Sequence, residues 1–520
     1  MTIFRRSVLL ARGGMIPNYF YPVTVALCLI AVTVVYFLNN PLKHGQWFLM
    51  RRFINWLPLG MSYAFLCMAR YNLNVAQGAL GPLMSNQDFG IIFATGTWTY
   101  ALSFLVNGPL IDKKIGGRNA MLISTLGSAL ANIALGILTW LIIAKQLKVN
   151  VVVAFSLIYS VNMYFQSFGA MSIIKVKAYW FHVRERGVFG AIFGTFISAG
   201  AYFAFDWSSA VVSLTSANAP DNLLKKIFAP AGSGFDATWA VFFVPAIILI
   251  IWLILDAWLI KNAPEDAKFP HFDTHDASSG QMHVEFSVLD LLGKIFASRL
   301  MIFIACVEFA GGVFRYSIWT WYKPFCQAVP QTGAEFFNDH WGWFLCIFGI
   351  VGGLSAGLIS DKLFHSRRGP PTAFLCGSVL LMAVVMMLFL FSQPIVVGSM
   401  SVLIVMASIG VTSLMSGTAA ADFGGRKATA TCMGIINAFA YLGSGLQSLC
   451  IGFLVPDKHA PANGQFVLHF IPRDWHWWPV FVMPFAVVGT YLSIKIWHEL
   501  PAATRKYIAD VEKKSRESQS

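Results

Sequence analysis

Two arginines are the first candidates for chemistry, because each lies inside a long stretch that is otherwise uncharged. Arg70 occurs in Ala-Arg-Tyr-Asn and Arg315 in Phe-Arg-Tyr-Ser, 245 residues later. If these stretches cross a membrane, each buried charge costs a few kcal/mol or more and is expected to face a cavity or a partner. Two guanidiniums on one cavity would clamp a phosphate or a carboxylate. The alternative is that each arginine extends to the outer surface, since Arg70 lies roughly 24 Å along its helix from residue 54.

Polar residues near the two arginines are candidates to line the same cavity. Tyr63 precedes Arg70 by seven residues and therefore shares its face of a helix. The full candidate set is Tyr63, Tyr100, Asn72, Tyr316, Asn162 and Gln166. Taken alone, each of these residues is more often a packing or interfacial residue.

A carboxylate also lies in the stretch that contains Arg315. Glu308 precedes Arg315 by seven residues, two helical turns, and so lies on the same face. Such a group either neutralises Arg315 as a fixed ion pair or takes up a proton, since protonation removes the cost of burying its charge. Asp206, followed by Trp207, lies at the end of an apolar stretch and is expected at the membrane interface.

The elements that must position these residues are membrane-spanning helices. The chain of 520 residues is 57% hydrophobic and 12% charged, with a mean hydropathy of +0.64, whereas a soluble domain carries about 25% charged residues. Apolar runs of about 20 residues have the length of a spanning helix and are too long for barrel strands. After a first run at 19–38, twelve spans are expected at 54–78, 91–111, 119–143, 150–173, 187–208, 238–260, 299–322, 341–360, 371–392, 396–419, 429–454 and 477–497.

Charge in the links between these runs predicts the orientation. Alternate links are rich in lysine and arginine, whereas the links between them, such as 77–90, have few cations. By the positive-inside rule, the cationic links are cytoplasmic. We favour the run at 19–38 as a thirteenth span, with an interfacial helix as the alternative. The expected location is a cell inner membrane, crossed many times.

The remaining composition excludes several classes of protein. The net charge of +13 lies mainly in the short links, so we expect no nucleic-acid partner. The eight cysteines lack CxxC spacing, and we expect free thiols, no metal site and no cofactor. A membrane enzyme would need clustered acid and base residues near one face, and His182 with Glu185 is the only near candidate. We therefore expect no catalytic residues.

Three features repeat along the chain at nearly one offset. The first is the pair of arginines. The second is Gly108-Pro-Leu-Ile-Asp-Lys-Lys-Ile-Gly-Gly-Arg118, which is matched by Gly357-Leu-Ile-Ser-Asp-Lys through Gly369. The third pairs Arg184-Glu-Arg-Gly with Gly425-Arg-Lys-Ala. The repeat predicts two similar six-helix halves.

The second repeated motif is expected to work as a latch between helices at the cytoplasmic face. Glycines allow tight turns, and charged side chains can pair with neighbouring helix ends. The latch residues are Asp112, Lys113, Arg118, Asp361 and Lys362.

The expected organisation has five segments. Residues 1–50 form an extension with the extra helix, 51–260 and 296–500 form the two halves, 261–295 form a polar cytoplasmic linker, and 501–520 form a cytoplasmic tail. The fold class is therefore an all-α membrane protein with pseudo-twofold symmetry.

The latch motif resembles the loop signature of the major facilitator superfamily. Within it, Tyr63 to Leu73, Arg315 to Trp321, Gly357 to Gly369 and Lys427 to Gly443 resemble the organophosphate:phosphate antiporter family, over roughly residues 50 to 500. That family includes carriers of glycerol-3-phosphate and hexose phosphates. The resemblance implies the major facilitator fold, places Arg70 and Arg315 at the substrate phosphate, and puts Tyr100 at a cavity tyrosine.

This sequence also departs from the family's pattern. The family's cavity histidines would fall near Ile197 and Ala419, and its cavity lysines are replaced by Tyr71 and Phe104. The site is therefore less basic than in the family, which puts phosphate exchange in doubt.

The leading interpretation is a secondary transporter that exchanges a phosphorylated metabolite for phosphate by alternating access around the two arginines. One alternative is a proton-coupled symporter of a non-phosphorylated organic anion that uses Glu308. Another is a transporter-like membrane sensor of sugar phosphate. The expected partners are a small anion, phosphate or a proton, and the lipid bilayer, and we expect a monomer.

Overall fold

The computed structural model of the chain is almost entirely helical. It describes residues 18–182, 185–229, 236–272, 293, 296–364, 367–415, 420–457, 466–467 and 471–498. Linker residues 273–292 and the tail at 501–520 therefore lie outside the described residues.

The helices before the linker form the extension and the first half of the fold. They are α2 (Phe20–Leu38), α3 (Gln46–Leu80), α4 (Asn86–Leu110), α5 (Gly116–Ile143), α6 (Val151–Trp180), α7 (Arg186–Tyr202), α8 (Ser208–Leu214), α9 (Leu223–Phe228) and α10 (Ala240–Leu259). Short 3₁₀ turns occur at η1 (Gly81–Leu83) and η5 (Glu265–Ala267), and π-helical turns at η2 (Ile111–Ile115) and η4 (Phe203–Trp207).

The second half repeats this plan after the linker. Its helices are α12 (Arg299–Ala328), α13 (Glu335–Asn338), α14 (Trp341–Leu363), α15 (Gly369–Phe389), α16 (Pro394–Thr412), α17 (Ala420–Leu454) and α18 (Trp477–Lys495). Strands β1 (Phe466–Val467) and β2 (Ile471–Pro472) pair antiparallel, with Phe466 opposite Pro472.

Eleven helical segments in the described part of the chain are long and apolar enough to cross a membrane, and α2 is one of them. The other two predicted spans coincide with α3 and with the continuous path α7–η4–α8. Their sequences explain why these two spans are not among the eleven. The helix α3 contains Arg51, Arg52 and Arg70, and α7 has only 17 residues before its π-helical turn.

Local sequence explains where several helices begin. Ser85 and Asp88 form a capping box at the start of α4, and Asn150 and Ser298 accept backbone N–H groups at the starts of α6 and α12. These side chains satisfy amide groups that have no partner inside the helix.

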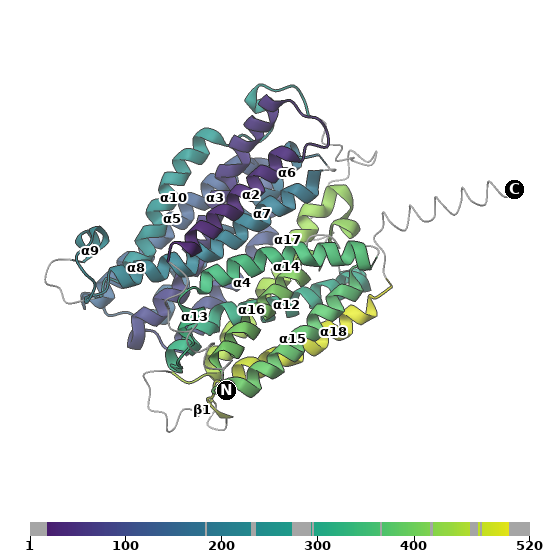
Figure 1. Ribbon diagram of the computed structural model, residues 1–520. Helices are drawn as coiled ribbons and strands as arrows, with labels where there is room; N and C mark the ends of the chain where they lie inside the picture. Colours follow the sequence, from purple (N-terminus) through teal and green to yellow (C-terminus); the bar gives the residue numbers. More distant parts are fainter. Residues whose placement is uncertain are drawn as a thin grey trace.

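The two halves lie side by side and meet mainly along two helix pairs. Helix α4 of the first half packs on α17 of the second, and α7 packs on α14 (Figure 1). We call the helix ends near residues 81–86, 206, 342 and 457 the outer face, because the cationic links lie at the opposite ends.

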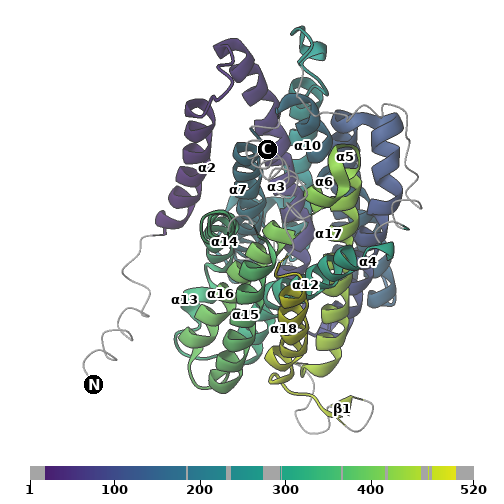
Figure 2. The same ribbon diagram turned by 90° about the vertical axis from the view of Figure 1, so that its right-hand side faces the viewer.

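The helix α2 touches both halves. It lies against α7 and α14 at the edge of the molecule (Figure 2). At one end Trp343 Nε1 donates to Thr24 Oγ1 at 2.7 Å, and Tyr21 stacks on His340 with ring centroids 3.5 Å apart. At the other end Tyr36 donates to the Leu49 carbonyl at 2.9 Å.

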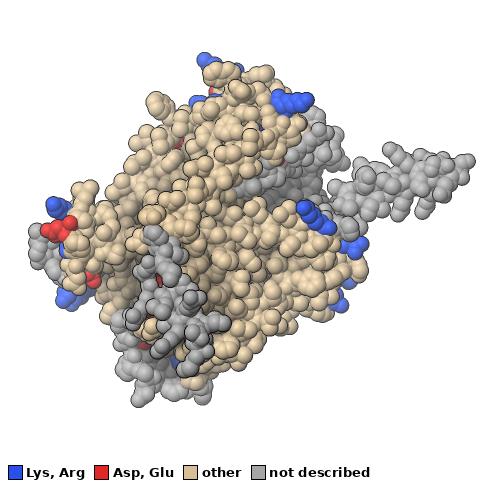
Figure 3. All heavy atoms as spheres, viewed as in Figure 1, with Lys and Arg blue, Asp and Glu red and all other residues tan. Residues whose placement is uncertain are grey.

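The visible side of the molecule matches a membrane environment. Lysines and arginines gather at the ends of the helices, and a broad uncharged flank separates them (Figure 3). A groove of about 620 Å³ between α5 and α6 is lined by aliphatic residues such as Leu126, Leu130 and Leu157, which are 45%, 57% and 65% exposed. It contains no group that could bind an anion, and we assign it to the lipid-facing surface.

Candidate functional site

Arg70 lies in the middle of α3 and is held by three neutral acceptors. Its Nε donates to Gln166 Oε1 at 2.7 Å, and its Nη1 and Nη2 donate to the hydroxyls of Tyr441 and Tyr100 at 3.1 and 3.2 Å. The guanidinium also lies over the Tyr100 ring, 4.4 Å from its centroid. The side chain is 1% exposed, so Arg70 does not extend to the outer surface in this conformation.

A polar stack between α3, α5 and α6 fixes Gln166 against Arg70. Gln166 Nε2 donates to Ser128 Oγ at 3.0 Å and to Asn162 Oδ1 at 3.3 Å, and Asn162 Nδ2 donates to the Ala69 carbonyl at 2.9 Å. Because each amide is oriented by the next, the acceptor of Gln166 points at the guanidinium. This network holds Arg70 in one orientation before any ligand binds.

Arg315 occupies the corresponding place on α12 and has fewer fixed partners. Its Nη2 lies 3.4 Å from the Tyr316 hydroxyl, and its carbon Cζ lies 4.7 Å from the centroid of the Tyr316 ring. Its Nε is buried and has no hydrogen-bond partner in the described part of the chain. An unsatisfied buried donor on a cation is costly, and an anion would satisfy it.

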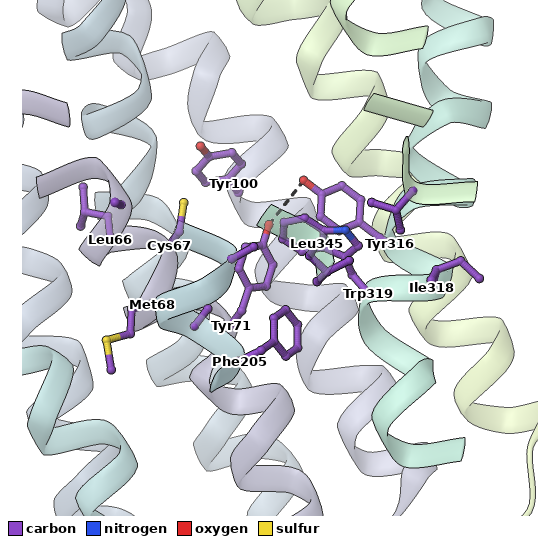
Figure 4. Packing of buried hydrophobic residues seen from close by; sticks show 14 of the residues in the cluster. Leu66, Cys67, Met68, Tyr71, Tyr100, Phe205, Tyr316, Ile318, Trp319 and Leu345 are labelled. Atoms are coloured by element: carbon purple, nitrogen blue, oxygen red, sulfur yellow. Dashed lines mark hydrogen bonds between the residues drawn. The ribbon is translucent and has the colours of Figure 1, made fainter. Parts of the chain in front are cut away.

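Tyrosines connect the two arginines across the junction of the halves. Tyr71 and Tyr316 meet hydroxyl to hydroxyl at 3.4 Å, with Trp319 and Phe205 packed around them (Figure 4). Tyr441, which binds Arg70, lies 5.5 Å from the Tyr316 ring. The two repeated arginines therefore face one cluster of aromatic side chains.

Tyr63 and Tyr100 also belong to this cluster. Tyr63 is 8% exposed and interacts with Arg70 and Tyr100. Phe104 packs edge-on against Tyr100, with ring centroids 4.7 Å apart. Tyr71 and Phe104, which stand where the related family has lysines, thus surround the site with rings instead of charges.

Asn72 lies on the other side of α3, away from the two arginines. Its Nδ2 donates to Asn132 Oδ1 at 2.8 Å and to the Val241 carbonyl at 3.1 Å. These contacts join α3 to α5 and α10. In this conformation Asn72 packs the first half together and does not contact the aromatic cluster.

Glu308 is fully buried on α12 and accepts a hydrogen bond from Thr412 Oγ1 at 3.3 Å. Glu308 and Arg315, which are both described, do not form an ion pair with each other. The fixed ion pair with Arg315 that the spacing suggests is therefore not formed in this conformation.

The latch residues are described in part. Arg118 Nη2 donates to the Ala257 carbonyl at 2.6 Å, and its backbone N–H donates to Asn262 Oδ1 at 2.7 Å, so this latch joins α5 to the end of α10 in the same half. Lys113 and Lys362 are exposed. The side chains of Asp112 and Asp361 lie outside the described residues.

The structure describes only one of the two positions that would hold histidines in the related family. Ile197 is 45% exposed on the flank of α7 and does not face the site. Ala419 lies outside the described residues.

Glu185 does belong to a polar cluster, but the cluster is an anchor at the cytoplasmic face. Arg52 Nη1 and Nη2 donate to its two carboxylate oxygens, each at 2.8 Å, and Arg52 Nε donates to the Tyr36 hydroxyl at 2.9 Å. Burial alone would raise the pKa of Glu185, but hydrogen bonds from His44, Arg52 and the backbone of His182, together with the charge of Arg52, lower it to about 2. Sequence reasoning missed this pair, because nothing local connects residues 133 positions apart.

Sequence reasoning also missed Tyr441 as a contact of Arg70. The residue stands in the small-residue run of α17, and only the docking of α17 on α4 brings it to the arginine.

Comparisons with known proteins agree with this geometry. A sequence model of the Major Facilitator Superfamily matches residues 59–448. The glycerol-3-phosphate transporter of Bacillus subtilis (strain 168) is 24% identical over 396 residues, which cover 74% of this chain and 81% of that protein. The membrane sensor protein UhpC of Escherichia coli (strain K12) is 23% identical over 443 residues, covering 83% and 92%.

Solved structures show the same fold. A bacterial homolog of the human lysosomal transporter Spinster, in an inward-facing and unoccupied conformation, has a TM-score of 0.63 at 15% identity and covers 87% of this chain and 98% of its own. FucP in the outward conformation has a TM-score of 0.53 at 13% identity, covering 84% and 97%. The fold is that of solved transporter structures, and the two sequence relatives are a transporter and a membrane sensor protein. With its two six-helix halves and a family match over most of its length, this multi-pass membrane protein belongs to the Major Facilitator Superfamily.

Proposed function

We propose that this protein carries a small phosphorylated organic anion, such as glycerol-3-phosphate or a sugar phosphate, and exchanges it for inorganic phosphate. The observation that supports this most is the environment of the arginines. Arg70 is buried among neutral acceptors, and Arg315 has a buried Nε without a partner in the described residues. An anion bound between them would supply the missing charge and acceptors.

The aromatic cluster defines what else the ligand contacts. Tyr63, Tyr71, Tyr100, Tyr316 and Tyr441 offer hydroxyls beside apolar ring faces. Hydroxyls and ring faces suit the carbon skeleton of a small polyol better than a second strongly charged group, because the site lacks the additional lysines of the related family. The binding of one phosphate at the arginines and one hydroxylated carbon chain at the tyrosines is therefore part of the proposal.

The location of the site supports alternating access. Arg70 and Tyr441 come from different halves, as do Tyr71 and Tyr316. A ligand held by both halves favours the arrangement in which both sets of contacts form, and rocking of the halves would expose it to each side in turn.

Counterflow into proteoliposomes tests the proposal. Vesicles loaded with phosphate are expected to take up radiolabelled phosphate, and external glycerol-3-phosphate or a hexose phosphate is expected to compete. Arg70→Ala and Arg315→Ala should each abolish counterflow, while Asn72→Ala, whose side chain lies away from the site, should retain it if the variant remains folded. If no phosphorylated compound competes, or if the arginine variants exchange phosphate normally, the proposal is wrong.

A proton-coupled symporter is the second candidate, favoured by the full burial of the Glu308 carboxyl group in α12, because protonation would remove the cost of burying its charge. It predicts uptake that a protonophore abolishes, whereas exchange of phosphate for organophosphate continues under the same treatment.

A sensor is the third candidate, because a membrane sensor protein is similar over 83% of this chain. It predicts that phosphorylated ligands raise the melting temperature of the purified protein by mass action, and that Arg70→Ala loses this effect, although no counterflow occurs. Thermal stabilisation together with counterflow excludes a sensor that only binds.

A further inference from the structure

Asp206 closes one end of the interface between the halves at the outer face. It belongs to the first half, in the π-helical turn after α7, and its two carboxylate oxygens accept the backbone N–H groups of Gly342 and Trp343 at 2.7 and 3.1 Å. Those amides are in the first turn of α14, in the second half, where they have no partner within their own helix. The carboxylate also stabilises the positive end of the α14 dipole.

Asp457 makes the same kind of contact in the opposite direction. It follows α17 in the second half, and its Oδ1 accepts the backbone N–H of Asn86, the first residue of α4 in the first half, at 2.6 Å. Its Oδ2 accepts from Arg473 Nη1 at 2.8 Å, and Arg473 Nη2 donates to Gln87 Oε1 at 2.8 Å.

The two contacts are related by the repeat of the fold. Asp206 lies in the π-helical turn of the fifth helical path of its half, α7–η4–α8, and Asp457 follows α17, the fifth helix of the other half. Each binds the start of the second helix of the opposite half, α14 or α4. Similar chemistry between corresponding pairs of helices indicates a shared role, since local capping alone would not require the donor to be in the other half.

The backbone around both contacts is packed too closely for side chains. A Cβ added to Gly342 would lie 2.8 Å from the Ala201 carbonyl oxygen, and one added to Gly452 would lie 2.8 Å from the Asn86 carbonyl oxygen. Such close approach of helix backbones allows each carboxylate to reach amides across the interface.

We propose that Asp206 and Asp457 are paired clasps that hold the outer face closed, and that both must release before the protein opens to the outside. Rocking of the halves separates the outer ends of α7 from α14 and of α17 from α4 together, because each half moves as one body. Each clasp is a charge-assisted contact that exists only in the closed arrangement, so each shifts the equilibrium toward it. The role concerns movement and holds for any cargo.

Hydrogen–deuterium exchange with mass spectrometry on the full-length protein, without ligand, tests the clasps. Asp206→Asn and Asp457→Asn preserve shape, but an amide side chain cannot accept hydrogen bonds through both of its terminal atoms. Loss of one charge-assisted contact is expected to raise the fraction of molecules that are open at the outer face roughly tenfold. In Asp206→Asn, exchange should therefore rise by about that factor at the distant clasp, in residues 86–90 and 448–455. In Asp457→Asn it should rise in residues 198–206 and 341–346.

Asp236→Asn is the matched control. Asp236 also lies on the outer face and accepts a backbone N–H, from Ala217 at 2.7 Å, but both residues belong to the first half. Its effect should stay within residues 215–237. In Asp206→Asn and Asp457→Asn, by contrast, cytoplasmic segments should exchange more slowly, because opening of the outer face closes the cytoplasmic face.

Three outcomes overturn the proposal. One is an effect confined to the amides that each mutated aspartate caps, which would mean simple helix capping. The second is faster exchange at both faces, which would mean general loss of stability. A folded double variant with wild-type exchange at the outer face would equally exclude the clasps.

Discussion

The buried pair between Arg52 and Glu185 makes a quantitative prediction about stability. The two side chains are each 2% exposed and meet through two hydrogen bonds of 2.8 Å. Arg52 also donates to Tyr36 of α2, so the pair connects α2, α3 and the start of α7. Removal of one member of a buried ion pair leaves the other charge without its partner, which typically costs about 3–5 kcal/mol.

The perturbations are Glu185→Gln, Arg52→Met and the double variant Arg52→Met/Glu185→Gln. We expect each single change to lower the free energy of unfolding by about 3–5 kcal/mol. The double variant should lose less than the sum of the two single variants, by about 2–3 kcal/mol, because no unpaired charge remains. Denaturant unfolding of the protein in detergent, followed by tryptophan fluorescence, measures these differences.

An exposed ion pair provides the control. Glu265 and His271 meet at 2.6 Å, but their side chains are 40% and 85% exposed. Solvent screens such a pair, so Glu265→Gln should change the unfolding free energy by less than about 1 kcal/mol. The reasoning is refuted if Glu185→Gln has an effect as small as this control, or if the Arg52 and Glu185 effects simply add.

The same pair predicts a dependence on pH. The pKa of Glu185 is lowered to about 2 in the folded protein, against about 4.3 in an unfolded chain. Because the folded pKa is the lower one, the stabilisation is fully present above about pH 4.3 and is lost as the pH falls toward 2. The stability difference between wild type and Glu185→Gln should therefore be constant from pH 5 to 8 and shrink in more acidic buffers. A difference that already shrinks between pH 8 and 5 would contradict the assignment.

Three further predictions concern the site and the packing of the halves. Gln166→Leu removes the 2.7 Å acceptor that orients Arg70 and should weaken binding of a phosphorylated ligand about tenfold, measured by titration calorimetry, with Gln166→Glu as a comparison that keeps an acceptor. Glu308→Gln should leave phosphate counterflow within about threefold of wild type if exchange is the mechanism, whereas loss of uptake driven by a pH gradient would favour symport. Gly312→Val would force a side chain into the backbone of Ala440 and should lower the melting temperature sharply or prevent recovery of folded protein, because α12 and α17 could no longer pack at this distance.

The sequence by itself determined the architecture. Apolar runs of spanning length, alternating cationic links and a repeat offset of about 245 residues depend only on local composition and on residue order. The same features identified Arg70 and Arg315, because a charge inside an apolar run is conspicuous without any structure. They also indicated the extra helix, which the structure shows as α2, long and apolar enough to span.

Only the tertiary structure decided which side chains meet. Helical periodicity gives the face of a residue relative to its own helix, but it does not say which helix packs on that face. Asn72 therefore contacts α5 and α10 instead of the site, and Tyr441 reaches Arg70 across 371 residues of sequence. Asp206 has the sequence context of an ordinary interfacial residue, and its bond to α14 exists because two halves with close-packed glycines meet at that point. In the proposed mechanism the two halves move against each other, so the contacts between them matter for function. These contacts arise from docking geometry that no local pattern encodes.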